Sequence, residues 1–183
     1  MPISPPPPIV GAFIAALVAL TVAVYNTYRA WKLRRDELTL TLCSRFFNKD
    51  MFVVRTESWK AAKRWMDGND PELLDHFIVP PQPFEGPVTA SSEPGENRLD
   101  SASNISALLH FFAELAVFYE LGLLNKRAIN AFFGDIYEWW SPFLRKFAEA
   151  YADETRGRQP KPVTPSWVTS VPKLDKIFKP STK

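Results

Sequence analysis

Two pairs of polar residues in the chain have types and spacing that could perform chemistry. His110 lies four residues before Glu114, and Asp135 lies three residues before Glu138. Residues three or four apart lie on the same face of an α-helix. The first pair could therefore supply two metal ligands. The second pair could act as general acid and general base, provided that their environments separate the two pKa values.

Each pair also has a purely structural interpretation. A stable metal site needs further ligands and a supporting shell, and His76 is the other histidine of the chain. Aromatic residues recur at helical spacing around both pairs, so we expect the polar side chains to flank a buried face. Asp135 and Glu138 would then point to solvent or pair with Arg127 and Arg145. On this basis the sequence predicts no catalytic residue, no cofactor and no metal.

Residues 99–154 carry two runs of apolar residues at helical spacing, which predict two helices. The apolar positions are Ile105, Leu108, Leu109, Phe112, Leu115, Ala116 and Tyr119 in the first run, and Ile129, Phe132, Phe133, Ile136, Trp140, Phe143, Leu144, Phe147 and Tyr151 in the second. Gly122 and Asn125 mark a short turn, which predicts that the two helices are antiparallel neighbours. Pro142 is expected to kink or restart the second helix.

Residues 29–79 are predicted to form the first helical half of the body. The pattern runs from Ala30 without glycine or proline, and Asn48 either ends this helix or caps the next one. Gly68 begins a strong break, after which Pro71 can occupy the first turn of a short helix. No alternating strand pattern of useful length occurs, so the predicted fold class is all-α.

Three segments have the composition of non-helical chain. They are the Pro-rich N-terminus at 1–8, a Pro-, Ser- and Gly-rich segment at 80–98 and the tail at 155–183. We expect the middle segment to be a flexible loop. The tail contains seven basic residues and one acidic residue, and we expect it to be disordered. It could serve solubility alone, contact lipid, or dock on the acidic body of another copy.

Residues 9–28 form a long apolar run without a charged residue. About 20 residues at ~1.5 Å per residue span ~30 Å, which is enough to cross the hydrocarbon core of a bilayer. A cleaved secretory signal is the competing interpretation, but it places basic residues before the apolar run. Here residues 1–8 contain none, and the basic residues follow the run. The sequence therefore predicts a transmembrane helix at 9–28.

Aromatic and basic residues follow this run, where a membrane interface would lie. The predicted interface residues are Tyr25, Tyr28, Arg29, Trp31, Lys32, Arg34 and Arg35. Because positively charged flanks favour the cytoplasmic side, we expect the N-terminus outside and the body in the cytoplasm. The predicted location is the cell (inner) membrane, in single-pass form, with membrane lipid as one partner.

The net charge of +2 is unevenly distributed along the chain. The basic residues at 29–35 contribute +4 and the tail contributes +6, so residues 36–154 carry −8. One basic segment with interleaved tryptophans contains Arg55, Trp59, Lys60, Lys63, Arg64 and Trp65. Such a mixture can bind nucleic acid. The acidic body argues against this, and we expect an amphipathic helix with its tryptophans inward and its lysines in solvent.

The remaining motifs are negative. The chain has no Gly-rich phosphate loop, no GxSxG elbow, no HExxH and no CxxC. Its single cysteine, Cys43, excludes an intramolecular disulfide framework and a cysteine-based zinc cluster. We expect Cys43 to fill a small buried apolar position.

The helical pattern resembles an uncharacterised family of small bacterial membrane-anchored helical proteins. The matching residues are Arg55, Trp59, Trp65, the segment LLHFFAELAVFYELGLLN, Phe133-Gly134, Trp139-Trp140 and Pro142. The resemblance covers roughly residues 9–150. It implies a bacterial or phage setting, a single-pass anchor and a helical cytoplasmic domain. The family has no established activity, so no functional residue is carried over.

The leading functional hypothesis is a non-enzymatic, single-pass membrane protein with a helical interaction or scaffold domain. Its expected partner is a second copy of the chain or another protein, and nucleic acid is not expected. One alternative is a membrane-permeabilising effector of a bacterial defence or toxin system, with Thr21 and Asn26 as polar groups within the anchor. Another is a metal- or carboxylate-dependent enzyme.

Overall fold

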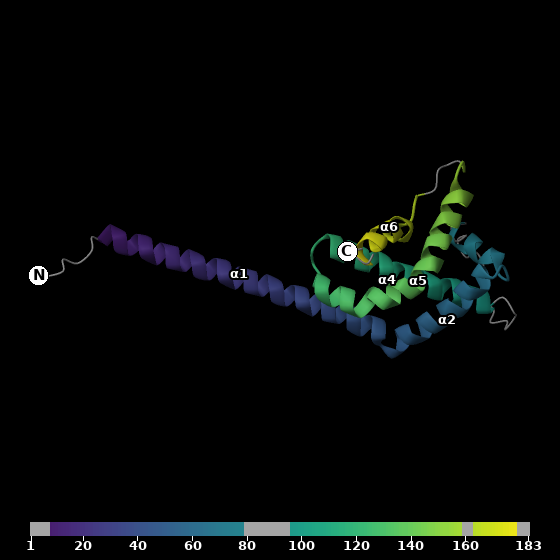
Figure 1. Ribbon diagram of the computed structural model, residues 1–183, viewed down its shortest axis with the longest axis horizontal. Coiled ribbons are helices and arrows are strands. Elements are labelled where there is room, and N and C mark those ends of the chain that lie inside the picture. The colour runs from purple at the N-terminus through teal and green to yellow at the C-terminus, as the bar shows by residue number, and fades with distance from the viewer. Residues whose placement is uncertain (1–7, 79–95, 159–162, 179–183) are drawn as a thin grey trace, which may run out of the picture.

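The structure is a computed structural model, which describes residues 8–78, 96–158 and 163–178, and every element in these ranges is helical. The predicted all-α class is therefore confirmed for the described chain. The Pro-rich N-terminus predicted at 1–8 lies almost entirely outside the described residues. A long helix projects from a helical body, and the other helices pack around one another at its end (Figure 1).

The projecting helix is α1 (Pro8–Phe47), a single element of 40 residues. It is continuous because the chain contains no glycine or proline between Ala12 and Phe47. The predicted continuation of the apolar run into the first body helix is confirmed. α1 ends at Asn48, which caps α2 (Lys49–Met66) by accepting a hydrogen bond from the Met51 N–H at 2.7 Å.

The break after α2 is also where the sequence predicts it. Gly68 adopts a φ of 77°, a left-handed conformation that favours glycine. The chain then forms a short 3₁₀ helix, η1 (Pro71–Leu74), and a single turn, α3 (Asp75–Ile78). Pro71 occupies the first turn of η1, where its missing N–H leaves no hydrogen bond unmade.

α4 (Glu96–Glu120) begins earlier than predicted. The flexible loop predicted at 80–98 lies mostly outside the described residues, which resume at Glu96. Most residues from Asp100 to Asn104 are of types that commonly cap helices, yet they lie inside α4. Ser101 and Ala102 are buried against the body, so tertiary packing outweighs the capping preference of this run.

α5 (Lys126–Thr155) is one helix despite Pro142 in its interior. Asn125 caps it by accepting a hydrogen bond from the Ala128 N–H at 3.2 Å. Proline at position 142 cannot donate to the carbonyl of Glu138, four residues earlier. The Ser141 hydroxyl donates to that carbonyl instead, at 3.1 Å. α5 changes direction along its length, in agreement with the predicted kink (Figure 1).

α4 and α5, which the sequence predicts to be antiparallel neighbours, contact each other through side chains rather than through closely packed backbones. The turn between them is short, but the closest backbone neighbours of α4 are α2 and α6. α2 buries three small residues, Ser58, Ala61 and Ala62, which let a neighbouring backbone come close. Between α4 and α5 lie large rings, including Phe111 against Phe133 with centroids 5.7 Å apart, and these hold the two backbones apart.

The prediction that the whole tail is disordered is also wrong. Residues 166–178 form α6 (Ser166–Phe178), which packs against α4 and α5. Trp167, Val171 and Leu174 are buried, and their spacing of four and three residues places them on one helical face. The high proline content and positive charge of the tail predicted disorder, although this short apolar face is present in the sequence. Tail residues 159–162 and 179–183 lie outside the described chain.

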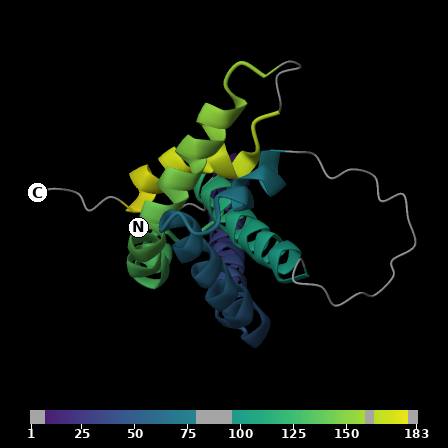
Figure 2. The ribbon, with the colours of Figure 1, turned by 90° about the vertical axis from the view of Figure 1, so that its right-hand side faces the viewer.

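α6 and α2 lie on opposite sides of the body, with α4 and α5 between them (Figures 1 and 2). The core that joins these layers is dominated by aromatic rings. Phe46 from α1 reaches its centre, with ring centroids 4.7 Å from Phe111 and 5.2 Å from Phe133. Because α1 supplies a central core residue, the projecting helix and the body form one folded unit.

Candidate membrane anchor and aromatic groove

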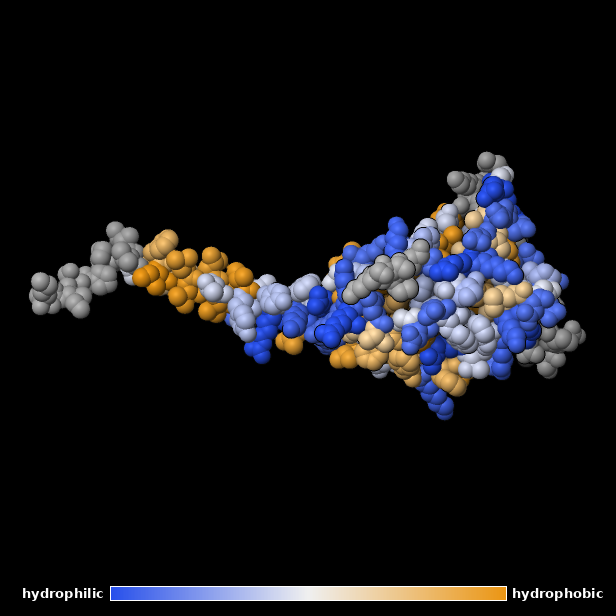
Figure 3. Space-filling model, in the orientation of Figure 1, coloured by the Kyte–Doolittle hydropathy of each residue, from blue (hydrophilic) through white to orange (hydrophobic). Residues whose placement is uncertain are grey.

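The N-terminal part of α1 makes no contact with the body. Every described side chain from Gly11 to Arg34 is exposed, although most of them up to Tyr28 are apolar. This segment forms the orange end of the molecule in Figure 3. By length and composition α1 could cross a membrane, and none of its most apolar window is buried. The segment Ser101–Glu120 has a similar composition, but 56% of its window is buried, as in a core helix.

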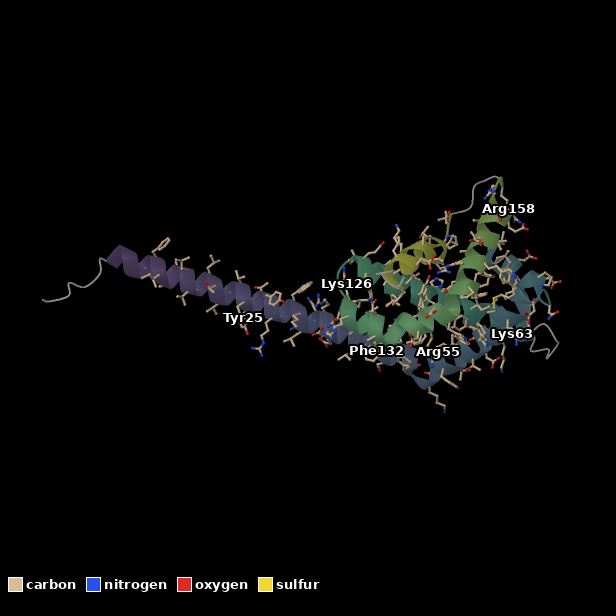
Figure 4. All side chains as sticks on the ribbon, viewed as in Figure 1. Tyr25, Arg55, Lys63, Lys126, Phe132 and Arg158 are labelled. Carbon is tan, nitrogen blue, oxygen red and sulfur yellow. The ribbon has the colours of Figure 1, made fainter. Side chains whose placement is uncertain are left out.

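The predicted interface residues lie on consecutive turns of α1, between the apolar segment and the body. The rings of Tyr28 and Trp31 are 6.5 Å apart, and the guanidinium of Arg35 lies 4.7 Å from the Trp31 ring centroid. Tyr25 is exposed on the same helix, and it is labelled in Figure 4. These aromatic and basic groups form one band, and the assignment of the band to a membrane interface stays a prediction.

A polar junction joins this band to the body. The Thr39 hydroxyl accepts a hydrogen bond from the Asn125 N–H at 2.8 Å, and the Asn125 amide donates to Asp36 at 2.8 Å. Asn125 also caps α5. One residue therefore ties the anchor helix to the start of α5, and the orientation of the body follows the orientation of α1.

The last turns of α1 belong to the core. Leu42, Cys43 and Phe46 are buried, and burial raises the pKa of the Cys43 thiol. The expected apolar role of Cys43 is confirmed. On the outer side of the same turns, Arg45 forms an ion pair with Glu114 of α4. Apolar and charged contacts both attach this end of α1 to the body.

The structure gives His110 and Glu114 separate partners. Nδ1 of His110 lies 2.8 Å from the carbonyl oxygen of Ser106 in the same helix, and Glu114 is bound by Arg45. Within the described residues, no three His, Cys, Asp or Glu side chains come together in a group that could hold a metal ion. The geometry therefore offers no support for a metal centre at this pair.

Asp135 and Glu138 are both exposed on α5, as expected for residues that flank a buried face. The predicted alternative of pairing with Arg145 is wrong, because Arg145 binds Asp175 of α6, with Nη2 2.6 Å from Oδ1. The same carboxylate accepts a hydrogen bond from the Tyr137 hydroxyl at 2.9 Å. Sequence reasoning missed this partner because it placed Asp175 in a disordered tail.

The basic helix α2 has its tryptophans against α5. The ring of Trp59 stacks on Trp139 with centroids 4.0 Å apart and meets the edge of Trp140 at 5.4 Å. Lys60 and Lys63 are exposed to solvent. This is the amphipathic arrangement that the sequence favoured over a nucleic-acid site.

The same contacts form a groove between α2 and α5 that sequence reasoning did not find. It encloses about 630 Å³ and is lined by Phe52, Arg55, Thr56, Trp59, Lys60, Asp135, Ile136, Trp139 and Trp140. Phe52 and Trp139 are at least half exposed. One available signal was that Trp139 falls outside the periodic apolar face of α5.

Arg55 lies in this groove and packs against three phenylalanine rings. Its guanidinium carbon is 4.5 Å from the ring centroid of Phe46, 5.5 Å from Phe47 and 5.8 Å from Phe52. Its buried Nε has no hydrogen-bond partner among the described residues. Partial burial lowers the pKa of Arg55, although a guanidinium remains charged at neutral pH. The groove thus contains a cation that forms no ion pair within the described part of the chain.

Two threonine hydroxyls in the exposed part of α1 form hydrogen bonds within their own helix. The Thr21 hydroxyl donates to the carbonyl of Leu17, and the Thr27 hydroxyl donates to Ala23, both at 2.8 Å and both within α1. A threonine that is satisfied by its own helix can face lipid without another partner. The alternative of a membrane-permeabilising effector, for which the sequence offered Thr21 and Asn26, stays a prediction.

Comparison with known proteins adds no identity to these observations. No family model matches the chain, no curated protein matches it and no solved structure matches it. The resemblance to a bacterial family of membrane-anchored proteins therefore receives no support. Any function must follow from the geometry of the chain itself.

Proposed function

We propose that this chain is a non-enzymatic, single-pass membrane protein that holds a helical interaction domain beside the cytoplasmic face of the cell membrane. The apolar part of α1 is the anchor, and the band from Tyr25 to Arg35 lies at the membrane interface. The helical body is the part that meets a protein partner. The proposal assigns no catalytic residue and no cofactor.

One observation supports this proposal above the others: α1 is a single helix that is exposed and apolar at one end and part of the core at the other. An exposed apolar helix of this length is costly in water and favourable in a bilayer. Because the same helix carries Phe46 and the Asn125 junction, the body is attached rigidly. Such an arrangement suits a scaffold that presents a surface at a set orientation to the membrane.

The proposal is tested by extraction of membranes from cells that express the full chain. The chain should stay in the pellet after carbonate and after high salt, and detergent should release it. Replacement of Leu17 and Leu20 in the apolar run by lysine should move the chain into the soluble fraction, because each charge at mid-bilayer costs about 3 kcal/mol. Release of the unmodified chain by carbonate would contradict a transmembrane anchor.

A further inference from the structure

The groove between α2 and α5 has walls of opposite charge. Its α2 wall contributes Arg55 and Lys60, and its α5 wall contributes Asp135. Lys60 has a partner on its own helix, since its Nζ lies 2.8 Å from Oε1 of Glu57. Arg55 and Asp135 form no ion pair with any described residue. Between the charged walls the surface is aromatic.

We propose that a second copy of the chain occupies this groove, so that two chains form a parallel dimer in which the α2 wall of each faces the α5 wall of the other. The proposal rests on the membrane-anchored function above. In a two-fold interface the same patch meets itself, and each residue of a contacting pair is used twice. A patch with a cation on one side and an anion on the other is complementary to its own rotated copy.

The geometry of the dimer follows from the anchor. Two chains inserted in the same direction are related by an axis along the membrane normal, so they meet through surfaces that lie to the side of α1. Arg55 and Phe132 lie along the lower edge of the body in Figure 4, and we take this edge as the contact surface. A two-fold rotation about the membrane normal, with its axis in this surface, places the α2 wall of one chain opposite the α5 wall of the other. It does not change the height of either wall above the membrane. Arg55 would then face Asp135 of the other chain, in two equivalent pairs.

The exposed aromatic residues favour the same occupant. Phe52 is 60% exposed, Trp139 is 50% exposed and Phe132 is 46% exposed. Apolar residues gather along this lower edge of the body in Figure 3. Aromatic side chains with an arginine are typical of the centre of protein interfaces. Confinement to one membrane also raises the effective concentration of the second copy, so a modest interface suffices.

The proposal is tested by disulfide cross-linking of the full chain in native membranes, in a Cys43→Ala background. Thr56→Cys and Ile136→Cys are made in separate chains with different tags, because both positions line the groove from opposite walls and Asp135 is left in place. Co-expression should give a cross-linked pair that carries both tags, in several-fold excess over either chain alone. Thr169→Cys is the matched control, since Thr169 is exposed and belongs to α6, which lies on the side of the body away from α2 (Figure 1).

A charge variant tests the same contact without a cysteine. Asp135→Arg places like charges opposite each other in the dimer and should lower the dimer fraction at least about tenfold. Glu138→Arg is the matched control, because Glu138 is equally exposed on α5 but does not line the groove. It should leave the dimer fraction unchanged. Circular dichroism of each variant in detergent checks that the helices are intact.

Several outcomes would overturn the dimer. One is equal cross-linking by Thr169→Cys, which would indicate random collision. Another is the absence of a cross-linked pair when the chain stays in the membrane pellet. This result would contradict the dimer but not the proposed anchor. A third is cross-linking of the groove to a different protein. Release by carbonate would instead remove the anchored function, and cross-linking of the released chain would still decide the dimer separately.

Discussion

The carboxylate of Asp175 is the residue-scale link between α5 and α6. It accepts the Tyr137 hydroxyl at 2.9 Å and pairs with the guanidinium of Arg145 at 2.6 Å. Burial, followed by the hydrogen bond to this carboxylate, raises the pKa of Tyr137 well above its ordinary value of 10.0. The ionised form of Tyr137 is therefore disfavoured in the folded chain.

This shift predicts a loss of stability at high pH. Because the folded pKa of Tyr137 lies above the unfolded one, its contribution to folding is complete below about pH 10 and declines as the pH rises further. Tyr137→Phe should weaken that decline and cost about 1 kcal/mol at neutral pH through the lost hydrogen bond. Urea unfolding of the detergent-solubilised chain at pH 8 and pH 11 measures both effects. An unchanged pH dependence in the variant would contradict the assignment.

Phe46 is the residue at which anchor and body meet, and it has no exposed surface. Phe46→Ala should lower the free energy of unfolding by about 3–5 kcal/mol, because a cavity replaces a ring that touches several others. Phe47→Ala is the matched control, since its neighbouring side chain is half exposed. Denaturant unfolding should show the much smaller effect for the control, and equal effects would argue against the described packing.

At the scale of elements, α6 covers apolar surface of α4 and α5 that would otherwise be exposed. Its residues Trp167, Val171 and Leu174 cover α4 and α5, and Trp167 meets Phe147 with ring centroids 5.5 Å apart. Lys173 adds an ion pair to Glu120 of α4 at 2.7 Å. The sequence left three roles open for the basic tail: solubility alone, contact with lipid, or docking on another copy. Its residues 166–178 instead pack on the body of their own chain.

Removal of α6 should therefore destabilise the body. A chain that ends at residue 162 should melt at a clearly lower temperature and expose α4 and α5 to protease, because their apolar faces lose their cover. A chain that ends at residue 178 retains α6 and should melt close to the full chain. Limited proteolysis and thermal melts in detergent provide the comparison. Identical protection of the two truncations would contradict a structural role for α6.

At the scale of the whole molecule, the distribution of charge along the long axis matches the proposed orientation. The apolar end of α1, orange in Figure 3, is followed in the sequence by the basic residues at 29–35 and then by residues 36–154, which carry −8. Basic residues close to the end of a transmembrane helix determine which side they occupy, whereas distant ones contribute little. In the proposed orientation, the basic band and the body therefore lie on the same side of the membrane.

Neutralising the basic band should disturb this orientation. Replacement of Arg29, Lys32, Arg34 and Arg35 by glutamine should give a mixed population, with part of the chains placing the body on the outside. Replacement of Lys173 and Lys176 in α6 by glutamine is the control and should leave the orientation unchanged. Labelling of an exposed cysteine at position 169 in intact and permeabilised cells measures the fraction on each side. An unaltered orientation in the neutralised chain would contradict the predicted topology.

The sequence alone determined the local features of this protein. The unbroken run into α1, the Asn48 cap, the Gly68 break and the short helix after Pro71 all agree with prediction. Helix formation, capping and the affinity for a bilayer depend on residues within a few turns of each other, so a linear pattern is sufficient.

Only the tertiary structure decided which faces meet. It brought α2 and α6 close to α4, packed α6 from the Pro-rich tail against the body, and placed Arg55 and Asp135 in the lining of one aromatic groove. Small residues on α2 and large rings on α5 set the distances between the helices. Neither effect produces a periodic pattern in the sequence. The surroundings of the polar pairs that could have performed chemistry also depend on the tertiary structure. Partners distant in sequence, such as Arg45 for Glu114, become neighbours only on folding.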